Sequence, residues 1–185
     1  MTQKTPRYTI ALSLAFATAA LTGLLALADR HVAADKIRPY VTWSGPDSAI
    51  QMPKYECARN EKDWAALWEK HSGAPLKRDN VQQPFMPHVD FEQCVVVAVF
   101  KGPGVNSNGV IVSEIVEEPD RILFRYDEST YQVSFGLNDK PRELPKVYPF
   151  GIFVLPKTSK PIVLQENTQG LKDEPPKWTE RAKLN

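Results

Sequence analysis

The clearest hydrophobic pattern in the chain is the spacing of apolar residues over positions 61–72, which predicts one amphipathic α-helix. The residues at positions i, i+3, i+4 and i+7 of this pattern are Trp64, Leu67, Trp68 and His71. Such spacing places side chains on one helical face. Asn60 suits the N-cap, and Gly73 suits the residue after the last turn. Because each tryptophan can bury roughly 150–250 Å², we expect Trp64, Leu67 and Trp68 to anchor the helix on a large apolar surface.

Most of the remaining hydrophobic pattern is typical of β-strands. Residues 95–100, VVVAVF, form a continuous and largely β-branched apolar run, which predicts a central strand covered on both faces. Residues 110–116 and 121–126 are joined by a short segment that contains Pro119, which favours a hairpin. The other expected strands are 40–43, 50–59, 131–135 and a final hairpin of 150–155 with 162–164.

Together these elements predict an α+β, β-rich fold. We expect a mainly antiparallel sheet or sandwich of about five to eight short strands with the amphipathic helix packed on it. Residues 29–50 are then a linker that includes an edge strand, residues 51–168 are the folded domain and residues 169–185 are a polar tail. Trp178 is the only aromatic residue of this tail, and we expect it to dock the tail on the domain.

The first 28 residues have the pattern of a bacterial-type export signal. Lys4 and Arg7 make residues 2–9 positive, residues 10–28 carry no charge, and residues 26–28, ALA, match the small-x-small cleavage pattern. The alternative is an uncleaved anchor, because the apolar run approaches the ~20 residues that cross a bilayer. Both interpretations place the domain in the periplasm or outside the cell, tethered to the inner membrane only if the segment is retained.

The charge balance argues against a nucleic-acid partner. The chain has 23 basic and 22 acidic residues, and removal of residues 1–28 changes the formal net charge from +1 to −1. A nucleic-acid-binding surface needs clustered basic residues on one face. A near-neutral chain with mixed signs of charge does not predict such a surface.

Cys57 and Cys94 are the two cysteines of the chain. In an oxidising compartment an even number of cysteines predicts a disulfide. Closing the 38-residue loop would stabilise the fold by about 4 kcal/mol. The alternative is that both are small, buried apolar residues. We favour the disulfide because of the expected compartment alone.

No pattern in the sequence identifies a catalytic, metal-binding or cofactor-binding site. A zinc site needs three or four closely spaced ligands, whereas His31, His71 and His88 are isolated. We interpret His71 as a partly buried residue at the edge of the core and His88 as a solvated loop residue. The acidic pairs 117–118 and 127–128 are interpreted as solvated turn charges. The sequence thus predicts no catalytic residue, no metal ion and no cofactor.

The glycine-rich segment 102–109, GPGVNSNG, is the one candidate recognition element. It lacks the spacing of a phosphate-binding loop, and a predicted strand follows it instead of a helix. We interpret it first as a hairpin loop rich in residues that tolerate positive φ. As an exposed loop on a rigid sheet it is also the segment that we expect to contact a partner. Its candidate residues are Gly102, Gly104, Asn106, Ser107, Asn108 and Gly109.

Several segments between residues 54 and 165 match one family in order and type. They are the Asp63-Trp64-x-x-Leu67-Trp68 motif, Val89-Asp90-Phe91 before the apolar run with Gly102, and residues 149–157 with 161–164. This part of the chain resembles the C-terminal domain of the protease complex subunit PrcB family. The resemblance implies an exported, non-enzymatic accessory domain that accompanies a secreted protease. The sequence departs from the family at residues 106–110, where the family has a Thr-Gly-Gly-Tyr-like loop, and it lacks the lipobox cysteine.

The sequence therefore predicts an exported, non-enzymatic domain that binds or stabilises a protein partner. The resemblance implies an envelope or secreted protease as that partner. Two alternatives remain open. One is a hydrolase with a site around His88 and Asp90, and the other is a small-ligand carrier that uses the face of Trp64 and Trp68.

Overall fold

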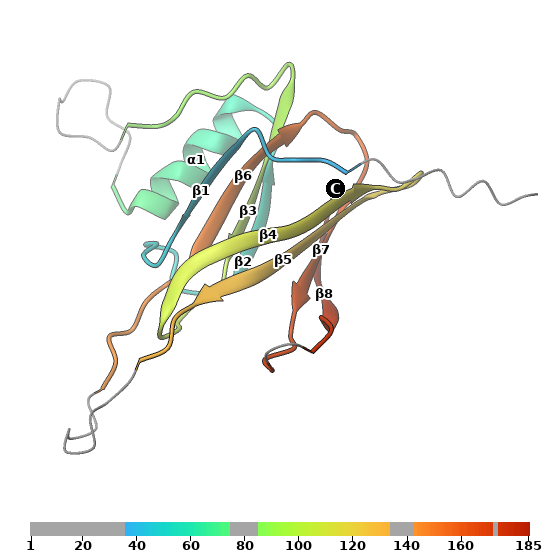
Figure 1. The fold of residues 1–185 in the computed structure, drawn as a ribbon. Helices are drawn as coiled ribbons and strands as arrows, with labels where there is room; N and C mark the ends of the chain where they lie inside the picture. Colours follow the sequence, from blue (N-terminus) through green and yellow to red (C-terminus); the bar gives the residue numbers. More distant parts are fainter. Residues whose placement is uncertain (1–35, 75–84, 134–142, 172–173) are drawn as a thin grey trace, which may run out of the picture. The chain divides into compact units, whose positions relative to one another are not determined.

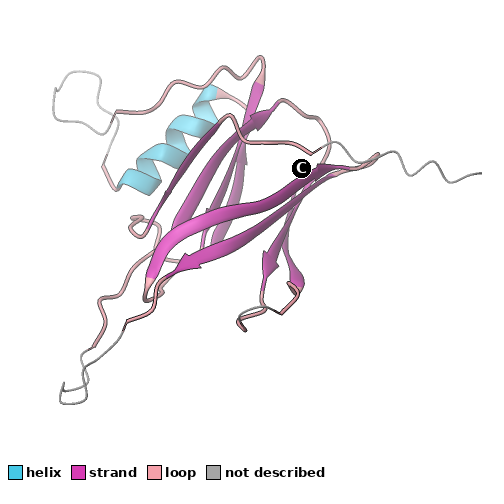
Figure 2. Cartoon of the chain, in the orientation of Figure 1, coloured by secondary structure: helices cyan, strands magenta, loops and turns pink. Residues whose placement is uncertain are grey.

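The computed structural model describes residues 36–74, 85–133, 143–171 and 174–185. The predicted export signal and His31 lie outside the described residues. No helix within the described ranges is long and apolar enough to cross a membrane. The elements, shown in Figure 1 and Figure 2, are β1 (Val41–Gly45), β2 (Lys54–Ala58), α1 (Glu61–Ser72), β3 (Cys94–Phe100), β4 (Ser107–Glu117), β5 (Ile122–Thr130), β6 (Phe150–Pro156), β7 (Ile162–Asn167) and β8 (Trp178–Leu184).

The strands form two four-stranded sheets that pack on each other. One sheet has the order β1-β6-β3-β2 and is antiparallel throughout. The other has the order β4-β5-β7-β8 and contains one parallel pair, β5 with β7. Helix α1 covers the outer face of the first sheet (Figure 1). The predicted α+β, β-rich fold is confirmed, as three layers of helix, sheet and sheet.

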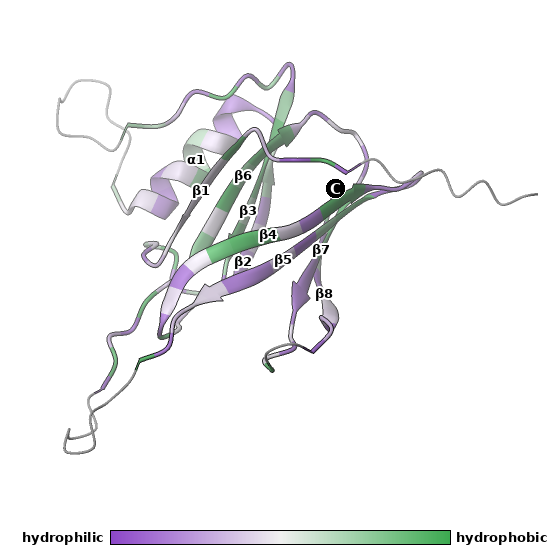
Figure 3. Cartoon of the chain, viewed as in Figure 1, coloured by the Kyte–Doolittle hydropathy of each residue, from purple (hydrophilic) through white to green (hydrophobic). Residues whose placement is uncertain are grey.

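Strand β3 lies inside this arrangement, and all of its residues are buried. Val95, Val97 and Val99 point into the core between the two sheets. Val96 and Ala98 point the other way, into a second core beneath α1. Figure 3 shows the hydrophobic residues concentrated on β3 and its neighbour β6. The prediction of a central strand covered on both faces is therefore confirmed.

The helix forms over the predicted residues because both of its ends are capped. The Asn60 side chain accepts a hydrogen bond of 2.9 Å from a backbone N–H of the first turn. Gly73 adopts a left-handed conformation with φ of 70°, in which a residue with a side chain is strained. Trp64 and Leu67 are 0% and 1% exposed, as expected of anchors, whereas Trp68 stays partly exposed.

Aromatic rings fill the contact between the helix and the first sheet. Trp43 of β1 stacks on Trp64 with 5.8 Å between ring centroids, and Trp68 lies 5.1 Å from Trp64. The indole N–H of Trp64 donates a hydrogen bond of 2.8 Å to the carbonyl of Pro87. The buried ring thus has its one polar atom satisfied, as burial requires.

The predicted hairpin of β6 and β7 is wrong. β6 pairs with β3 and β1 in the first sheet, whereas β7 pairs in parallel with β5 in the second. The segment between them therefore crosses from one sheet to the other. Both strands carry apolar residues that face the same inter-sheet core, so their hydrophobic pattern does not distinguish a hairpin from a crossover.

The predicted polar tail is also wrong in part, because it contains strand β8. This strand forms the edge of the second sheet, and only Ala182 and Leu184 pack against the core. An edge strand with one half-covered face has few apolar residues. With β1 at one end and β8 at the other, the domain extends beyond residues 51–168 on both sides. The strand predicted at 131–135 is absent from its described part, residues 131–133, and Phe135 lies outside the described residues.

The predicted disulfide is wrong, because Cys57 and Cys94 are both free. The register of β2 and β3 pairs Cys57 with Val97, three residues along β3 from Cys94. The two side chains also lie on opposite faces of the sheet, Cys57 against the inter-sheet core and Cys94 in the core beneath α1. A bridge needs Cβ atoms about 3.5–4.5 Å apart, and this geometry excludes it. Both cysteines act as small apolar residues, the alternative given above.

We predict that Trp64→Ala lowers the free energy of unfolding by about 3–5 kcal/mol, because it leaves a cavity between α1 and the first sheet. The matched control is Trp178→Ala. Trp178 is a partly exposed residue of β8 that has Arg125 above its ring at 5.3 Å, and its loss should cost about 1 kcal/mol. Urea denaturation followed by far-UV circular dichroism measures both values. Equal losses in the two variants would show that the helix does not depend on Trp64.

Candidate functional site

The candidate recognition loop, residues 102–109, includes most of the connection from β3 to β4 and also the first three residues of β4. The prediction of a hairpin loop is wrong, because β3 and β4 lie in different sheets. The backbone of the loop is held by hydrogen bonds to neighbouring segments. Gly104 and Val147 exchange two backbone hydrogen bonds of 2.8 and 2.9 Å. The carbonyl of Asn106 accepts a third, of 3.0 Å, from the N–H of Tyr131. The loop is therefore fixed at several points and presents a defined surface.

Most of the six candidate residues shape the loop and do not project from it. Asn106 has φ of 57°, a left-handed conformation that asparagine tolerates better than most residues. Ser107 is 1% exposed, and its hydroxyl accepts a hydrogen bond of 3.2 Å from the N–H of Gly109. Gly109 has φ of 118°, and a Cβ there would lie 2.5 Å from the backbone nitrogen of Gly45. Among the six, only Asn108 has an exposed side chain.

The exposed apolar side chains at this end of the sandwich are residues that the sequence analysis did not single out. Val105 is 51% exposed, and Tyr131, tied to the loop through Asn106, is 45% exposed. We call Val105, Asn108 and Tyr131 the tip surface. The alternating pattern at 131–135 predicted that Tyr131 lies in a strand. Val105 was not singled out because glycines and asparagines surround it in the sequence. The exposure of these two side chains was not readable from the sequence.

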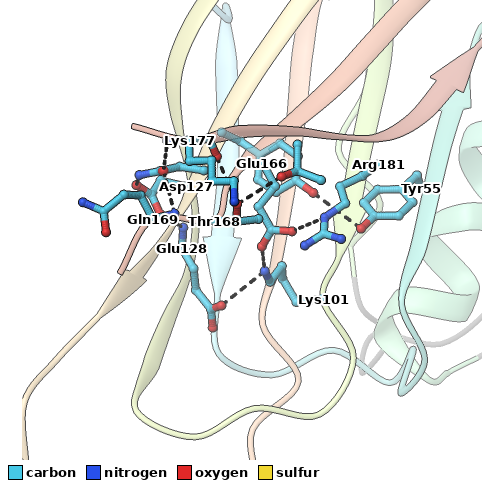
Figure 4. Close-up of polar contacts among 12 residues, drawn as sticks. Tyr55, Lys101, Asp127, Glu128, Glu166, Thr168, Gln169, Lys177 and Arg181 are labelled. Carbon is cyan, nitrogen blue, oxygen red and sulfur yellow. Dashed lines mark hydrogen bonds and ion pairs between the residues drawn. The ribbon is translucent and has the colours of Figure 1, made fainter. Parts of the chain in front are cut away.

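A cluster of charged side chains holds the base of the loop (Figure 4). The ammonium group of Lys101, the residue just before the loop, contacts the carboxylates of Glu128 at 3.4 Å and of Glu166. The other carboxylate oxygen of Glu166 accepts a hydrogen bond of 2.6 Å from Nε of Arg181. Lys101 lies beyond the end of β3, its two partners come from β5 and β7, and Arg181 of β8 joins the cluster through Glu166. The cluster therefore ties the loop to three strands of the second sheet.

The burial of Glu166 makes this cluster a structural requirement. Glu166 is 7% exposed, and an ionised carboxylate removed from water needs paired and hydrogen-bonded cations. Arg181 reaches it because of a β-bulge. Ala182 pairs with Leu164 and Glu180 pairs with Gln165, so Arg181 is the extra residue, and bulges redirect side chains in this way.

Two aromatic hydroxyls flank the charged cluster. The hydroxyl of Tyr126 lies 3.5 Å from that of Tyr55, and burial raises the pKa of Tyr126 far above its usual range. Tyr126 therefore stays neutral.

The two predicted pairs of turn charges differ in the structure. Lys160 and Arg121 contact Glu117 and Glu118 at a strand end, in accord with the interpretation as turn charges. Asp127 and Glu128 instead lie within β5. Asp127 accepts a hydrogen bond of 2.8 Å from the Asn167 amide, and Glu128 belongs to the cluster around Lys101. The interpretation of 127–128 as turn charges was therefore wrong.

His71 joins the end of α1 to the segment before β2. Its Nδ1 lies 3.0 Å from the hydroxyl of Ser48, which also accepts the N–H of Ile50 at 3.1 Å. The Ser48 hydroxyl thus joins His71 to the backbone before β2, and it can bond to the neutral ring in either tautomer. The ring packs 4.2 Å from Phe150, and burial lowers the pKa of His71. This agrees with the predicted residue at the edge of the core.

His88 and Asp90, the residues of the alternative hydrolase site, lie in the loop before β3. His88 is exposed, and Asp90 accepts a hydrogen bond of 2.9 Å from the N–H of Glu92 in a local turn. The structure thus gives Asp90 a turn role and does not join it to His88. Within the described residues, no group of three or more histidine, cysteine, aspartate or glutamate side chains could hold a metal ion.

The surface proposed for the alternative ligand carrier is occupied by protein. Trp43, Trp64 and Trp68 contact one another with ring centroids 5.1–5.9 Å apart. This packing fills the space beneath α1 that a ligand would need. The structure therefore assigns these rings to the core.

Comparisons with known proteins give no relative. No family model matches the chain, and no match was found among the curated proteins or the solved structures.

We predict that Glu166→Gln lowers the free energy of unfolding by about 2–3 kcal/mol, because Lys101 and Arg181 lose their shared carboxylate. The value stays below that of a fully buried pair because the Arg181 side chain is 38% exposed. The control is Glu114→Gln, since Glu114 also contacts two cations, Lys36 and Arg125, but its side chain is 30% exposed. That variant should lose less than about 1 kcal/mol. Thermal and urea denaturation measure both, and similar losses would contradict the structural role of Glu166.

We predict that the domain loses stability as the pH falls through the usual titration range of histidine, because of His71. The pKa of His71 is lower in the folded chain than its ordinary value of 6.5, so the unfolded chain binds the proton first. The free energy of unfolding therefore decreases as the pH falls below about 7 and levels off once the folded form is also protonated.

The variant His71→Asn retains an acceptor for Ser48 but does not titrate, so its stability should change less over this pH range. His88→Asn is the control and should keep the pH dependence of the unmodified chain, because His88 is exposed. Urea denaturation at a series of pH values measures the three slopes. A steep slope retained in His71→Asn would assign the effect to another group.

Proposed function

We propose that this chain is an exported, non-enzymatic domain that binds a protein partner through the tip surface. The observation that carries the proposal is that Val105 in the loop and Tyr131 just after β5, 51% and 45% exposed, lie on two segments that backbone hydrogen bonds hold together. Exposed apolar side chains gathered at one place are typical of protein interaction sites. Tyrosine is among the residues enriched in the centres of such sites.

The rigidity of the loop favours binding, because little conformational entropy remains to be lost when a partner docks. Asn106, Ser107 and Gly109 set the backbone, and the charged cluster around Lys101 fixes the base of the loop. The tip surface therefore holds its side chains in place before contact. In this proposal the candidate loop residues act mainly as a support, while Val105, Asn108 and Tyr131 make the contact.

The class of partner in this proposal is an envelope or secreted protease. Two features of the sequence support it: the export pattern of residues 1–28 and the resemblance to the PrcB family carried by the Asp63-Trp64-x-x-Leu67-Trp68 motif. An accessory domain needs a stable scaffold and an accessible contact surface. The three-layer fold provides the first, and the tip surface is our candidate for the second.

The proposal predicts that Val105→Asp combined with Tyr131→Ser lowers partner capture about tenfold or more, because both apolar contacts are lost. The melting temperature should change little, because both side chains are exposed. Ile111→Asp is the matched control, since Ile111 is also apolar and 50% exposed but lies elsewhere on β4. Capture by the unmodified chain and by each variant is measured by pull-down with the tagged full chain from envelope fractions of the producing organism. Photo-crosslinking residues placed at position 105 or 111 of the otherwise unmodified chain, followed by mass spectrometry of the adducts, identify what each position contacts.

An adduct that contains an exported protease at position 105 and is absent at position 111 supports the proposal. Equal crosslinking at both positions, or capture that the double variant does not reduce, excludes the tip surface as the contact. The non-enzymatic part of the proposal has its own test. Turnover in a broad hydrolase screen that is lost in His88→Ala would overturn it.

A further inference from the structure

We propose a second binding surface beside α1: a slot along the free edge of β2 that binds an extended, acidic peptide segment as an added strand. β2 is the end strand of its sheet and pairs only with β3. Within the described residues, no other backbone hydrogen bond uses Lys54–Ala58. An unpaired strand edge offers N–H and C=O groups to an incoming strand.

A groove of about 460 Å³ runs along this edge. Residues 55–58 all line it. Consecutive side chains of a strand point to opposite faces of the sheet, so a groove that touches four in a row follows the edge and not one face. Four strand residues span about 13 Å, which is enough for a peptide segment of about four residues to lie beside the backbone.

The opposite wall of the slot is one face of α1. Asp63, Ala66, Leu67 and Lys70 line it, and they are spaced by three, one and three residues, so they share one side of the helix. Leu184 at the end of β8 also lines the slot. Alanine at position 66 has a small side chain on this wall, and the partly exposed Leu184 offers an apolar contact to a bound strand.

The charges around the slot favour an acidic peptide. The two acids are already engaged: Glu56 contacts the ammonium group of Lys54, and Asp63 accepts a hydrogen bond of 2.7 Å from the Asn60 amide. The two other lysines that line the slot are Lys70 and Lys183, and within the described residues no salt bridge involves either. The Asn60 amide is neutral, so Asp63 keeps its charge. With Glu56 paired to Lys54, two lysines and one side-chain carboxylate remain in the lining, and this balance favours an acidic ligand.

The slot and the tip surface share no residue, so this inference does not rest on the proposed function. Arg59 follows the last slot-lining residue of β2, and its guanidinium group donates hydrogen bonds to backbone oxygens of Thr158 and Asn185. The tip surface follows β3 beyond the other end of this sheet. Loss of peptide binding at the slot and loss of capture at the tip surface can thus be measured separately.

The test uses the full chain and a fluorescein-labelled peptide of eight residues that alternates valine and glutamate. We expect saturable binding by fluorescence anisotropy. A matched peptide of alternating valine and lysine should bind about tenfold more weakly, and so should the valine–glutamate peptide in which every backbone nitrogen is methylated, which cannot donate main-chain hydrogen bonds. Equal affinity for all three peptides, or binding of none, overturns the inference.

Two variants of α1 locate the binding. Ala66→Trp fills the slot and should weaken binding about tenfold or more, whereas Lys62→Trp, also exposed on α1 but outside the slot, should change it less than about twofold. Lys70→Glu combined with Lys183→Glu should reverse the preference, so that the valine–lysine peptide binds more tightly. That reversal cannot result from misfolding.

Undiminished binding in Ala66→Trp overturns the proposed location. The other possible occupant of the slot is a second copy of the chain, and sedimentation measurements test for such a dimer. A dimer that Ala66→Trp dissociates would mean that the slot is a self-association interface and would overturn the peptide assignment.

Discussion

The whole architecture depends on the burial of β3 from both sides. Its alternate valines meet the second sheet on one face and the helix-covered core on the other. A strand of this kind cannot be stable without both layers, because each exposed apolar side chain would lose roughly 1.5–3 kcal/mol of burial free energy. Trp64 supplies the cover on the helix side, and Phe124 and Phe153, 5.1 Å apart, fill the inter-sheet core. Because β3 is packed on both faces, it fixes the positions of the loop that follows it and of the neighbouring strand β2.

The charged cluster around Glu166 holds the structure together where the hydrophobic core between the two sheets ends. Glu166 lies on the inward face of β7, in line with Ile162 and Leu164 of the inter-sheet core. At that position Glu166 is 7% exposed, and both Lys101 and Arg181 contact its carboxylate. Ion pairs are directional, whereas apolar contacts are not. The cluster therefore fixes where the loop begins more sharply than another leucine would.

Some of this structure could be predicted from the sequence, and the limits have physical causes. The helix bounds and the buried strand were readable because capping by Asn60 and Gly73 and the run at 95–100 are local signals. The crossover from β6 to β7 could not be predicted, because strands that face one core carry the same hydrophobic pattern whichever sheet they join. β8 was missed because an edge strand needs few apolar residues. The disulfide prediction failed because it was based on an expected oxidising compartment, which does not determine strand register. The register of β2 and β3 places Cys57 and Cys94 on opposite faces of the sheet.

The candidate sites were harder still, since each arises from residues far apart in the chain. The candidate loop was recognised by its glycines, yet those glycines shape the backbone, and the exposed contacts come from Val105 and from Tyr131 on another segment. The slot needs β2, α1 and β8 together. Strand β8 connects the two surfaces physically: Arg181 holds Glu166 at the base of the loop, and Lys183, two residues further on, lines the slot. Displacement of β8 would therefore alter both surfaces at once, whereas a change confined to the loop or to α1 would alter only one.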